Sequence, residues 1–311
     1  MLDVRRMRVL REVAARGSFS AAADALAYTQ SAVSQQIAAL EREAGTVLVD
    51  RSARGVRLTD AGRALVDHAD VILARLADAE AELEAIAGLR GGRLRLAAFP
   101  SAGATIMPEA IARFRERYPA VELSLEPAEP EPALAMLRAG EVDIGLDISA
   151  GFRTAREDGL ERVALLDDPM YVALPARHPL ARKRTLKLSE LADESWILGT
   201  TGSCPDASIF LRSCQLAGFE PRIAFNSDDY FAIQGFVAAG VGASFIPDLA
   251  LVNVRDDIVV RSLGARPPVR RVTAAVLEGS FCSPARRAML DVLVEVGGEF
   301  AGRRSELALA S

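Results

Sequence analysis

The residues best suited to a chemical role lie near the N-terminus and are polar hydrogen-bonding groups. Four of them fall within six consecutive positions: Gln30, Ser31, Ser34 and Gln35. Short hydroxyl and amide side chains of this kind hydrogen-bond to the edges of DNA bases. Arg51 and Arg54 follow, and arginine binds phosphate oxygens and fits a narrow groove. These residue types together predict contact with double-stranded DNA.

Two helices joined by a tight turn must position the four polar residues. After a first helix that ends at Gly17, residues 21–26 have the composition of a short helix. Thr29 is a good N-cap for a further helix that runs to about Glu43 and ends at Gly45. Its apolar residues recur at helical spacing and must face inward: Val33, Ile37 and Leu40. The polar residues are then left on the outward face near the N-terminal end, as in the recognition helix of a helix-turn-helix.

A β-hairpin is predicted over residues 47–59, directly after the recognition helix. Residues 47–49 and 56–58 have the pattern of two short strands, with residues 53–55 at the turn. Arg51, Arg54 and Arg57 lie on or near this hairpin, which suits a wing that contacts phosphates or the minor groove. The alternative is that the three arginines form an ordinary solvated face. Their position directly after a helix-turn-helix favours the wing.

Three segments of the N-terminal region resemble the DNA-binding head of the LysR-type transcriptional regulators: GSFSAAADAL, TQSAVSQQIAALEREAG and VLVDRSARGVRLTDAG. Two positions depart from that family, which usually has proline where Ser31 lies and an aromatic residue where Val49 lies. The resemblance implies a winged helix-turn-helix domain over residues 1–62. It also implies one set of DNA-binding residues: Thr29, Gln30, Ser31, Ser34, Gln35, Arg51 and Arg54.

The charge distribution agrees with a DNA-binding head on an acidic body. The whole chain has a formal net charge of −5, but residues 1–63 contain ten Arg against seven Asp or Glu. Residues 64–90 contain two Arg against six acids. A basic segment is what attraction to phosphates requires, whatever the charge of the rest.

One long helix is predicted over residues 60–88, and it provides a connector of residues 63–90 that joins two subunits. Its apolar residues recur at alternating steps of four and three, as in the a and d positions of a coiled coil. The alternative is an amphipathic helix that packs on its own domain, but the narrow stripe and the acidic flanks favour a partner helix. The predicted dimerisation residues are Leu65, Ile72, Leu76, Leu83 and Ile86. A homodimer or homotetramer would follow, since paired heads match a two-fold symmetric DNA site.

From residue 91 the pattern changes to alternating strands and helices, so the chain as a whole is α/β with an all-α head. The segments RFRERYP, LRAGEVDIGL, ALPARHPL, LADESWIL and AAGVGASFIP resemble the effector domain of the same family. The resemblance implies a two-lobed, periplasmic-binding-protein-like domain over residues 91–302. Lobe I is predicted to comprise residues 91–166 and 268–302, and lobe II residues 167–267.

A small-molecule effector is expected between the lobes, beyond the carboxyl ends of strands and at helix N-termini. The predicted effector-binding residues are Ser101, Ala102, Glu129, Thr200, Thr201, Ser203 and Asp228. The alternative for Ser101 and Ser203 is that they only cap helices. Glu129 or Glu131 near the cleft would disfavour a simple anionic effector and favour a polar or cationic one, unless both point into solvent.

Two cysteines provide a competing hypothesis. Cys204 and Cys214 are placed and spaced nearly as in the peroxide-sensing branch of the resembled family, where two thiols form a reversible disulfide. A redox sensor needs an accessible thiol of low pKa beside a resolving partner. Cys204 lies in an exposed-looking turn, but Cys214 is on the apolar face of a predicted helix, where a buried free thiol is the commoner outcome.

Other classes of protein are disfavoured. With only His68 and His178 in the chain, neither a metal cluster nor a catalytic triad is apparent, so no enzyme, metal or cofactor is expected. A solute-binding protein without DNA function would explain the body but leave the head unexplained. The absence of a signal-peptide pattern and of a membrane-spanning apolar run predicts a cytoplasmic protein. Effector binding would move the paired heads and change DNA bending or contact with RNA polymerase.

Overall fold

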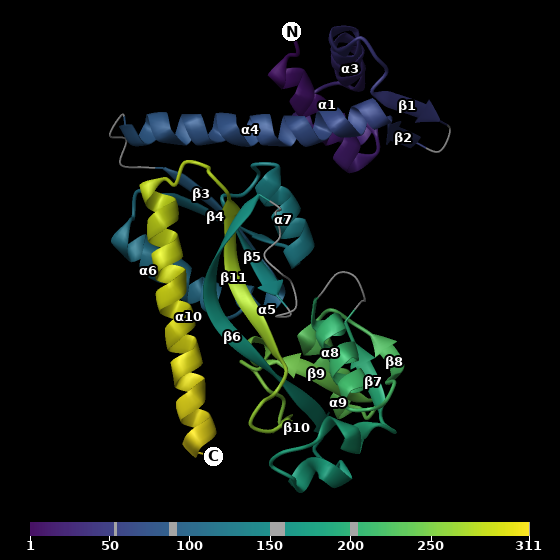
Figure 1. Cartoon of the computed structure of the whole chain (residues 1–311), viewed down its shortest axis with the longest axis vertical. Helices are drawn as coiled ribbons and strands as arrows, with labels where there is room; N and C mark the ends of the chain where they lie inside the picture. Colours follow the sequence, from purple (N-terminus) through teal and green to yellow (C-terminus); the bar gives the residue numbers. More distant parts are fainter. Residues whose placement is uncertain (53–54, 87–91, 150–158, 200–204, 311) are drawn as a thin grey trace. The chain divides into compact units, whose positions relative to one another are not determined.

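The computed structural model describes residues 1–52, 55–86, 92–149, 159–199 and 205–310. Contacts divide the chain into two compact units. The first contains the N-terminal helices and a hairpin, and the second contains a large mixed sheet with its covering helices (Figure 1). Prediction placed Arg54 at the wing turn; that residue lies outside the described residues.

The first unit is helical apart from one hairpin. Its elements are α1 (Val4–Arg16), α2 (Phe19–Leu26), α3 (Gln30–Ala44), β1 (Val49–Ser52), β2 (Gly55–Leu58) and α4 (Asp60–Ile86). Local capping sets the helix ends. Asp3 caps α1, Ser18 caps α2 and Thr29 caps α3, each accepting backbone N–H bonds in the first turn. Helix α4 begins at Asp60, where the long connector helix was predicted to begin, so the predicted domain boundary at residues 62 and 63 lies within the helix.

The turn between α2 and α3 contains an unusual backbone conformation. Ala27 has a φ of 54°, and no other non-glycine residue in the described part of the chain has a positive φ. A residue with a Cβ is strained in this left-handed region. The turn nevertheless forms because the N–H groups of Ala27 and Tyr28 donate to the carbonyls of Asp24 and Ala23. The tight helix-turn-helix geometry is therefore imposed by packing and backbone hydrogen bonds.

The hairpin begins two residues later than the sequence pattern predicts. The predicted first strand covered residues 47–49, whereas β1 pairs Val49 with Leu58 and ends with Ser52 opposite Gly55. The reason is that earlier backbone groups are already bonded to side chains. Oε1 of Glu41 accepts the N–H of Leu48 at 3.0 Å, and the hydroxyl of Thr59 donates to the carbonyl of Val47 at 2.8 Å.

The second unit is built on a nine-stranded mixed sheet. Its strands are β3 (Arg93–Ala98), β4 (Glu122–Pro127), β5 (Ile144–Ser149), β6 (Leu160–Pro175), β7 (Ser195–Leu198), β8 (Arg222–Asn226), β9 (Ala243–Pro247), β10 (Ile258–Ser262) and β11 (Val269–Leu277). Its helices are α5 (Pro100–Gly103), α6 (Ile106–Arg117), α7 (Pro130–Arg138), α8 (Pro205–Leu216), α9 (Tyr230–Ala238) and α10 (Pro284–Ala310). Short 3-10 turns cover Pro179–Arg182, Leu188–Leu191 and Asp248–Ala250.

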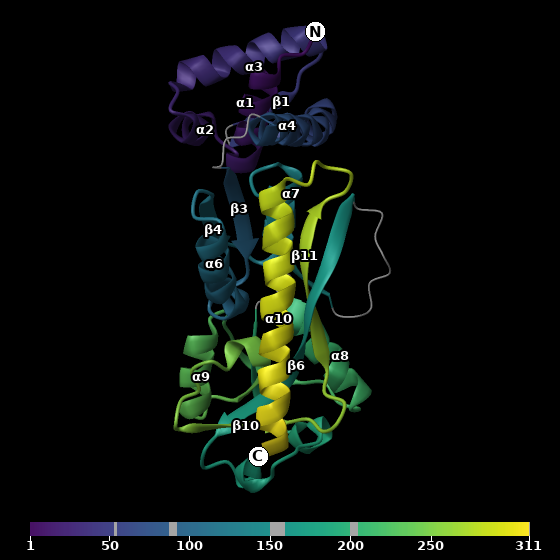
Figure 2. The same ribbon diagram turned by 90° about the vertical axis from the view of Figure 1, so that its left-hand side faces the viewer.

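The strands form two groups that share β6. The order is β4-β3-β5-β11-β6-β9-β7-β8, and β10 also pairs with β6. We call the group around β3, β4 and β5 lobe I, and the group around β7, β8 and β9 lobe II. The first half of β6 pairs with β11 and its second half pairs with β9 and β10, so one strand passes through both lobes (Figures 1 and 2). The predicted boundary between the lobes, at residues 166 and 167, therefore falls in the middle of β6.

Each lobe has its own apolar core. In lobe I, β3 and β5 pack against α6 and α10, and Phe114 and Met289 are fully buried there. In lobe II, the single tryptophan of the chain, Trp196, is fully buried and contacts the ring of Phe210, with ring centroids 4.7 Å apart. Separate cores allow the lobes to move as bodies about the strands that connect them.

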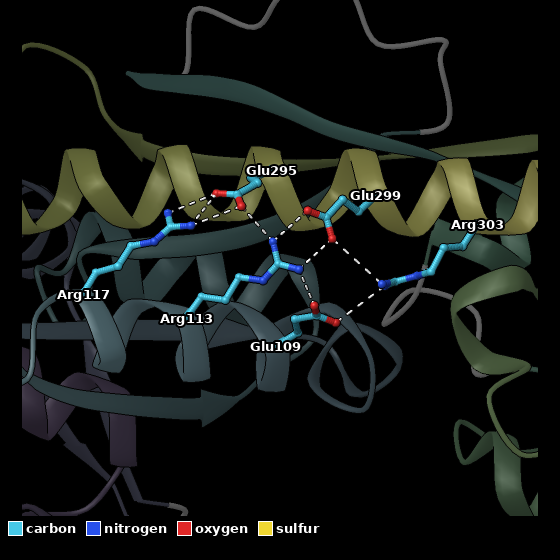
Figure 3. Close-up of polar contacts among 6 residues, drawn as sticks. All are labelled: Glu109, Arg113, Arg117, Glu295, Glu299 and Arg303. Atoms are coloured by element: carbon cyan, nitrogen blue, oxygen red, sulfur yellow. Dashed lines mark hydrogen bonds and ion pairs between the residues drawn. The ribbon is translucent and has the colours of Figure 1, made fainter.

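Helix α10 extends to Ala310, past the predicted end of the effector domain at residue 302, and packs along α6 and β6 (Figure 2). Figure 3 shows the ion pairs that join its outer side to α6. Arg113 on α6 lies 2.8 Å from Glu295 and 2.6 Å from Glu299, measured between nitrogen and carboxylate oxygen. The complete network contains Glu109, Arg113, Arg117, Glu295, Glu299 and Arg303. Single exposed pairs stabilise little, but a network of six charges fixes the register of the two helices.

Two adjacent glycines of α10 provide a matched test of this packing. A Cβ on Gly297 would lie 2.8 Å from the carbonyl oxygen of Leu165 on β6, whereas a Cβ on Gly298 would meet nothing within 4 Å. Alanine favours a helix over glycine by about 1 kcal/mol at either position. We expect Gly298→Ala to raise the melting temperature by a few degrees and Gly297→Ala to lower it. Calorimetry of both variants checks this, and equal shifts would contradict the packing of α10 on β6.

Candidate DNA-binding surface and ligand pocket

The recognition helix α3 has the two faces that the sequence predicts. Val33, Ile37 and Leu40 are fully buried in the core of the first unit. Gln30, Ser31 and Gln35 are exposed, and Ser34 is half-buried. Thr29 is also exposed, and its hydroxyl is occupied as the cap of α3, accepting the N–H of Ala32 at 3.2 Å. The structure therefore groups the five predicted residues at one end of one helix.

The predicted arginines are less completely placed. Arg51 lies on β1, opposite Val56 in the hairpin, but its side chain is outside the described part of the chain. Arg57 on β2 is exposed beside it in the same hairpin. A wing contact by these residues stays a prediction.

The predicted dimerisation residues differ in their surroundings. Ile72, Leu76 and Leu83 are exposed on α4 by 37%, 45% and 66%. Leu65 instead packs against the core of the first unit, because the first turns of α4 cover that core. Leu65 is therefore better explained by the fold of its own subunit. The side chain of Ile86 is outside the described residues.

A pocket lies between the two lobes of the second unit and has a volume of about 520 Å³ with its open mouth included. Lobe I contributes Ser101 from α5 and Glu129 from the residues before α7. Lobe II contributes Asp206 from α8 and Asp228 from the residues before α9. The remaining lining is largely apolar or aromatic: Phe99, Pro100, Ile148, Leu198, Gly199, Ser227, Tyr230, Ile233, Ser244, Phe245 and Arg270. Apolar walls with a few convergent polar groups are typical of a site for a small molecule.

Arg270 on β11 forms the buried centre of this pocket and contacts both lobes. Its Nη2 donates to Oγ of Ser101 in lobe I at 2.7 Å, and its Nη1 donates to Oδ2 of Asp206 in lobe II at 2.9 Å. Its Nε donates to Oδ2 of Asp168 on the shared strand β6 at 2.6 Å. Arg270 and Asp168 are almost completely buried. The ring of Phe99 lies 5.2 Å from the guanidinium carbon.

The carboxylates around Arg270 are in unequal environments. Oδ1 of Asp168 accepts the N–H of Leu249 at 3.1 Å, so both its oxygens are bonded. Oδ2 of Asp206 also accepts the hydroxyl of Tyr230, but Oδ1 of Asp206 has no hydrogen-bond partner among the described residues. Burial raises the pKa of Asp168 to about 6, although Arg270 acts to lower it.

Glu129 faces these groups from lobe I and is half-buried. Burial raises the pKa of Glu129 to about 7, and the carboxylates of Asp206 and Asp228 also raise it, while Arg270 lowers it. The carboxylates outnumber the single guanidinium in this region. The pocket is therefore acidic, and the carboxyl group of Glu129 changes between its neutral and ionised forms near neutral pH.

Only some of the predicted effector-binding residues line the pocket. Ser101, Glu129 and Asp228 line the pocket. Ala102 does not, because it is fully buried in the core of lobe I. Thr200, Thr201 and Ser203 lie outside the described residues, and Glu131 is exposed away from the pocket lining. Ser101 is not a helix cap, since α5 has no side-chain cap and the Ser101 hydroxyl accepts from Arg270.

Sequence reasoning missed the central residues of the pocket. Arg270 belongs to a late strand far along the chain, and Asp206 and Tyr230 begin helices of lobe II. A signal did exist for Arg270, because a charged residue in the apolar alternation of β11 requires a buried partner. Asp168 gave the same signal, because it is a charged residue in the middle of the largely apolar strand β6.

The pocket predicts a pH dependence of stability. A carboxyl whose pKa is raised in the folded state favours folding below its unfolded pKa and loses that contribution as pH rises through the folded value. For Glu129 this window extends from about pH 4.5 to about pH 7. We expect the free energy of unfolding of Glu129→Gln to fall less than that of the wild type across this window. At pH 8 the variant should be more stable than the wild type by about 1 kcal/mol. Urea denaturation at pH 5 and pH 8 measures this, and an unchanged slope would argue against the buried carboxyl.

Cys214 is buried in the core of lobe II, and burial raises the pKa of its thiol to about 12. Since the thiolate is the reactive form, the folded protein should alkylate at this position very slowly. We expect iodoacetamide to modify Cys214 only after denaturation, with the half-exposed Cys282 as the internal control. Mass spectrometry of the peptides gives the rates. Rapid disulfide formation between Cys204 and Cys214 on addition of peroxide would overturn this expectation.

In the described residues, no helix is both long and apolar enough to cross a membrane. The same residues contain no group of three or more His, Cys, Asp or Glu side chains arranged to hold a metal ion.

A winged helix-turn-helix joined to a two-lobed domain with a ligand pocket defines a class of DNA-binding regulators that respond to small molecules. The model of the bacterial regulatory helix-turn-helix proteins of the lysR family matches residues 4–63, and that of the LysR substrate binding domain matches residues 87–298. The chain belongs to the LysR family of transcriptional regulators.

Individual relatives agree with this membership. The chain is 33% identical over 299 residues to a probable HTH-type transcriptional regulator LrrA of Synechococcus elongatus, covering 96% of this chain and 98% of that protein. It is 35% identical over 273 residues to a probable hydrogen peroxide-inducible genes activator of Mycobacterium avium, covering 86% and 85%. A solved full-length OxyR variant from Pseudomonas aeruginosa has a TM-score of 0.70 and 26% identity, covering 96% and 95%.

Proposed function

We propose that this regulator binds operator DNA through paired heads and that a small molecule in the pocket between the lobes controls this binding. The observation that supports control by a ligand is the position of Arg270. Its guanidinium donates to Ser101 in lobe I and to Asp206 in lobe II, directly beside the pocket. A ligand that competes for or adds to these bonds changes the relative stability of lobe arrangements, as a population shift requires.

The DNA contacts are assigned to the outward face of α3 and to the hairpin. Gln30, Ser31, Ser34 and Gln35 contact base edges, and Arg51 and Arg54 contact phosphates, with Thr29 at the start of the helix. Each good bidentate base contact contributes about 1–3 kcal/mol of discrimination. Exposed amides at the N-terminal end of a recognition helix support the assignment.

Dimerisation is assigned to α4. Apolar side chains that remain exposed on this long helix, Ile72, Leu76 and Leu83, support pairing with a second copy. A homodimer, or a homotetramer made from two dimers, would present two heads to one operator. We further propose that the protein acts in the cytoplasm, catalyses no reaction and requires no cofactor. It would change transcription by contacting RNA polymerase.

Base-contact variants test the proposed function. Gln35→Ala should weaken binding to the DNA upstream of the gene by about tenfold or more in a gel shift and leave binding to unrelated DNA nearly unchanged. The control is Gln36→Ala, because Gln36 points back to α1 and accepts from Arg6 at 3.2 Å. Equal affinity of the Gln35 variant and the wild type for upstream DNA would contradict the assignment.

Thiol-based redox sensing is the weaker alternative. The similarity to a probable hydrogen peroxide-inducible activator supports it, but the burial of Cys214 and the raised pKa of its thiol argue against it. A solute-binding protein without DNA function is excluded by the helix-turn-helix family match.

A further inference from the structure

The charges that line the pocket are arranged across the gap between the lobes. Glu129 belongs to lobe I, whereas Asp206 and Asp228 belong to lobe II, and all three line the same pocket. The carboxylates of Asp206 and Asp228 raise the pKa of Glu129, so they act on it across the gap between the lobes. Like charges on opposite walls favour separation of the lobes unless a positive charge lies between them.

The guanidinium of Arg270 lowers the pKa of Glu129, but its hydrogen bonds go to other groups. Its three nitrogens donate to Ser101, Asp168 and Asp206, and its side chain is almost completely buried. With Asp168 and Asp206 as its two carboxylate partners, the guanidinium is already more than neutralised. A carboxylate ligand would therefore enter a region of net negative charge and find this cation occupied.

One carboxylate has unused hydrogen-bonding capacity. Asp206 is only 6% exposed and lines the pocket, and its Oδ1 accepts no hydrogen bond within the described residues. A buried acceptor of this kind costs free energy unless a donor is provided. The rings of Tyr230 and Phe245 line the same pocket and suit a cation better than an anion, because ring faces are negative.

We propose that the effector of this regulator is a small cation, an amine or guanidinium compound, that binds between Glu129 of lobe I and Asp206 and Asp228 of lobe II. The cation neutralises the repulsion across the gap and draws the lobes together. Ammonium and guanidinium groups carry several N–H donors and no acceptor, so they match a pocket lined by three carboxylates in which Oδ1 of Asp206 accepts no hydrogen bond from a described residue. This inference rests on the proposed function, since it names the ligand class of the same pocket.

The pH dependence of binding follows from the groups that face Glu129. These are Asp206 on α8, Asp228 before α9 and Arg270 on β11, with Asp168 on β6 and Tyr230 on α9 behind them. Glu129 must be ionised to bind a cation, so affinity for a permanently charged amine should rise about tenfold between pH 6 and pH 8. An anionic ligand would show the opposite sign.

Isothermal titration calorimetry of the full chain tests the proposal with matched probes. The cations are butylamine, 1,4-diaminobutane and agmatine, and the anions of similar length are butyrate and succinate. We expect at least one cation to bind at millimolar concentration or better, more tightly at pH 8 than at pH 6. Glu129→Gln should weaken it about tenfold or more and remove the pH dependence, whereas Glu131→Gln, an exposed neighbour outside the pocket, should bind as the wild type does.

Three results would overturn the cationic class: binding of an anion in preference to the cations, no binding of any of the three cations, or unchanged affinity in Glu129→Gln. Salt-sensitive DNA binding is measured on the same preparations. If DNA binding is present while the cations fail, only the ligand class is wrong. If DNA binding is absent, the proposed function fails whatever the pocket binds.

Discussion

Replacing Arg270 by methionine should lower the free energy of unfolding by about 3–5 kcal/mol. Methionine fills most of the volume but leaves Asp168 and Asp206 buried without their cation. The pKa of Asp168 is already raised to about 6 with Arg270 present, and it should rise further without it. The variant should therefore lose most stability at neutral and alkaline pH and recover part of it in acid, where the carboxyls are neutral.

Urea denaturation followed by tryptophan fluorescence measures this effect, because the single tryptophan, Trp196, is fully buried in lobe II. The control is Arg113→Met, which removes a partly exposed arginine from the surface network and should lower stability much less than Arg270→Met does. Asp168→Asn combined with Arg270→Met should regain part of the loss. A stability for Arg270→Met within about 1 kcal/mol of the wild type would show that the buried network does not hold the lobes.

Substituting Gly62 by alanine should have the largest effect on the head. A Cβ on Gly62 would lie 2.0 Å from the carbonyl oxygen of Leu48, which is backbone and already accepts the N–H of Thr59. Neither group can give way without separating α4 from the hairpin. We expect a loss of about 3 kcal/mol in the head and a loss of DNA binding.

Circular dichroism melting together with a gel shift would measure the Gly62 variant. The matched control is Gly103→Ala in the second unit, where an added Cβ meets nothing within 4 Å and DNA binding should be unchanged. Wild-type DNA affinity in Gly62→Ala would be incompatible with the close approach of α4 to Leu48.

The head was predictable from sequence because its signals are local. Helical spacing placed Val33 and Ile37 inside, and Thr29 marked the start of α3 as its cap. The hairpin shifted by two residues because the side chains of Glu41 and Thr59, which lie outside both predicted strands, bind the backbone of Leu48 and Val47. Leu65 fitted the heptad pattern but packs on the head, since spacing alone does not reveal which surface an apolar stripe meets.

The pocket was only half predictable because its centre depends on long-range contacts. Ser101, Glu129 and Asp228 follow strands, and position after a strand is a local feature. Arg270 lies 102 residues from Asp168 and 169 residues from Ser101, so only the folded sheet brings them together. The hypothesis that Glu129 or Glu131 disfavours an anion depended on which of the two faces the cleft, and the structure places Glu129 there.

The central claim is that this chain is a DNA-binding regulator, and DNA titration at several salt concentrations tests it most directly. Fluorescence anisotropy with a labelled duplex from upstream of the gene is measured between about 50 and 200 mM salt. We predict saturable binding that weakens steeply as salt rises and that unrelated DNA competes for poorly. Failure to bind at any salt concentration, or binding that is equal for upstream and unrelated DNA, would contradict it.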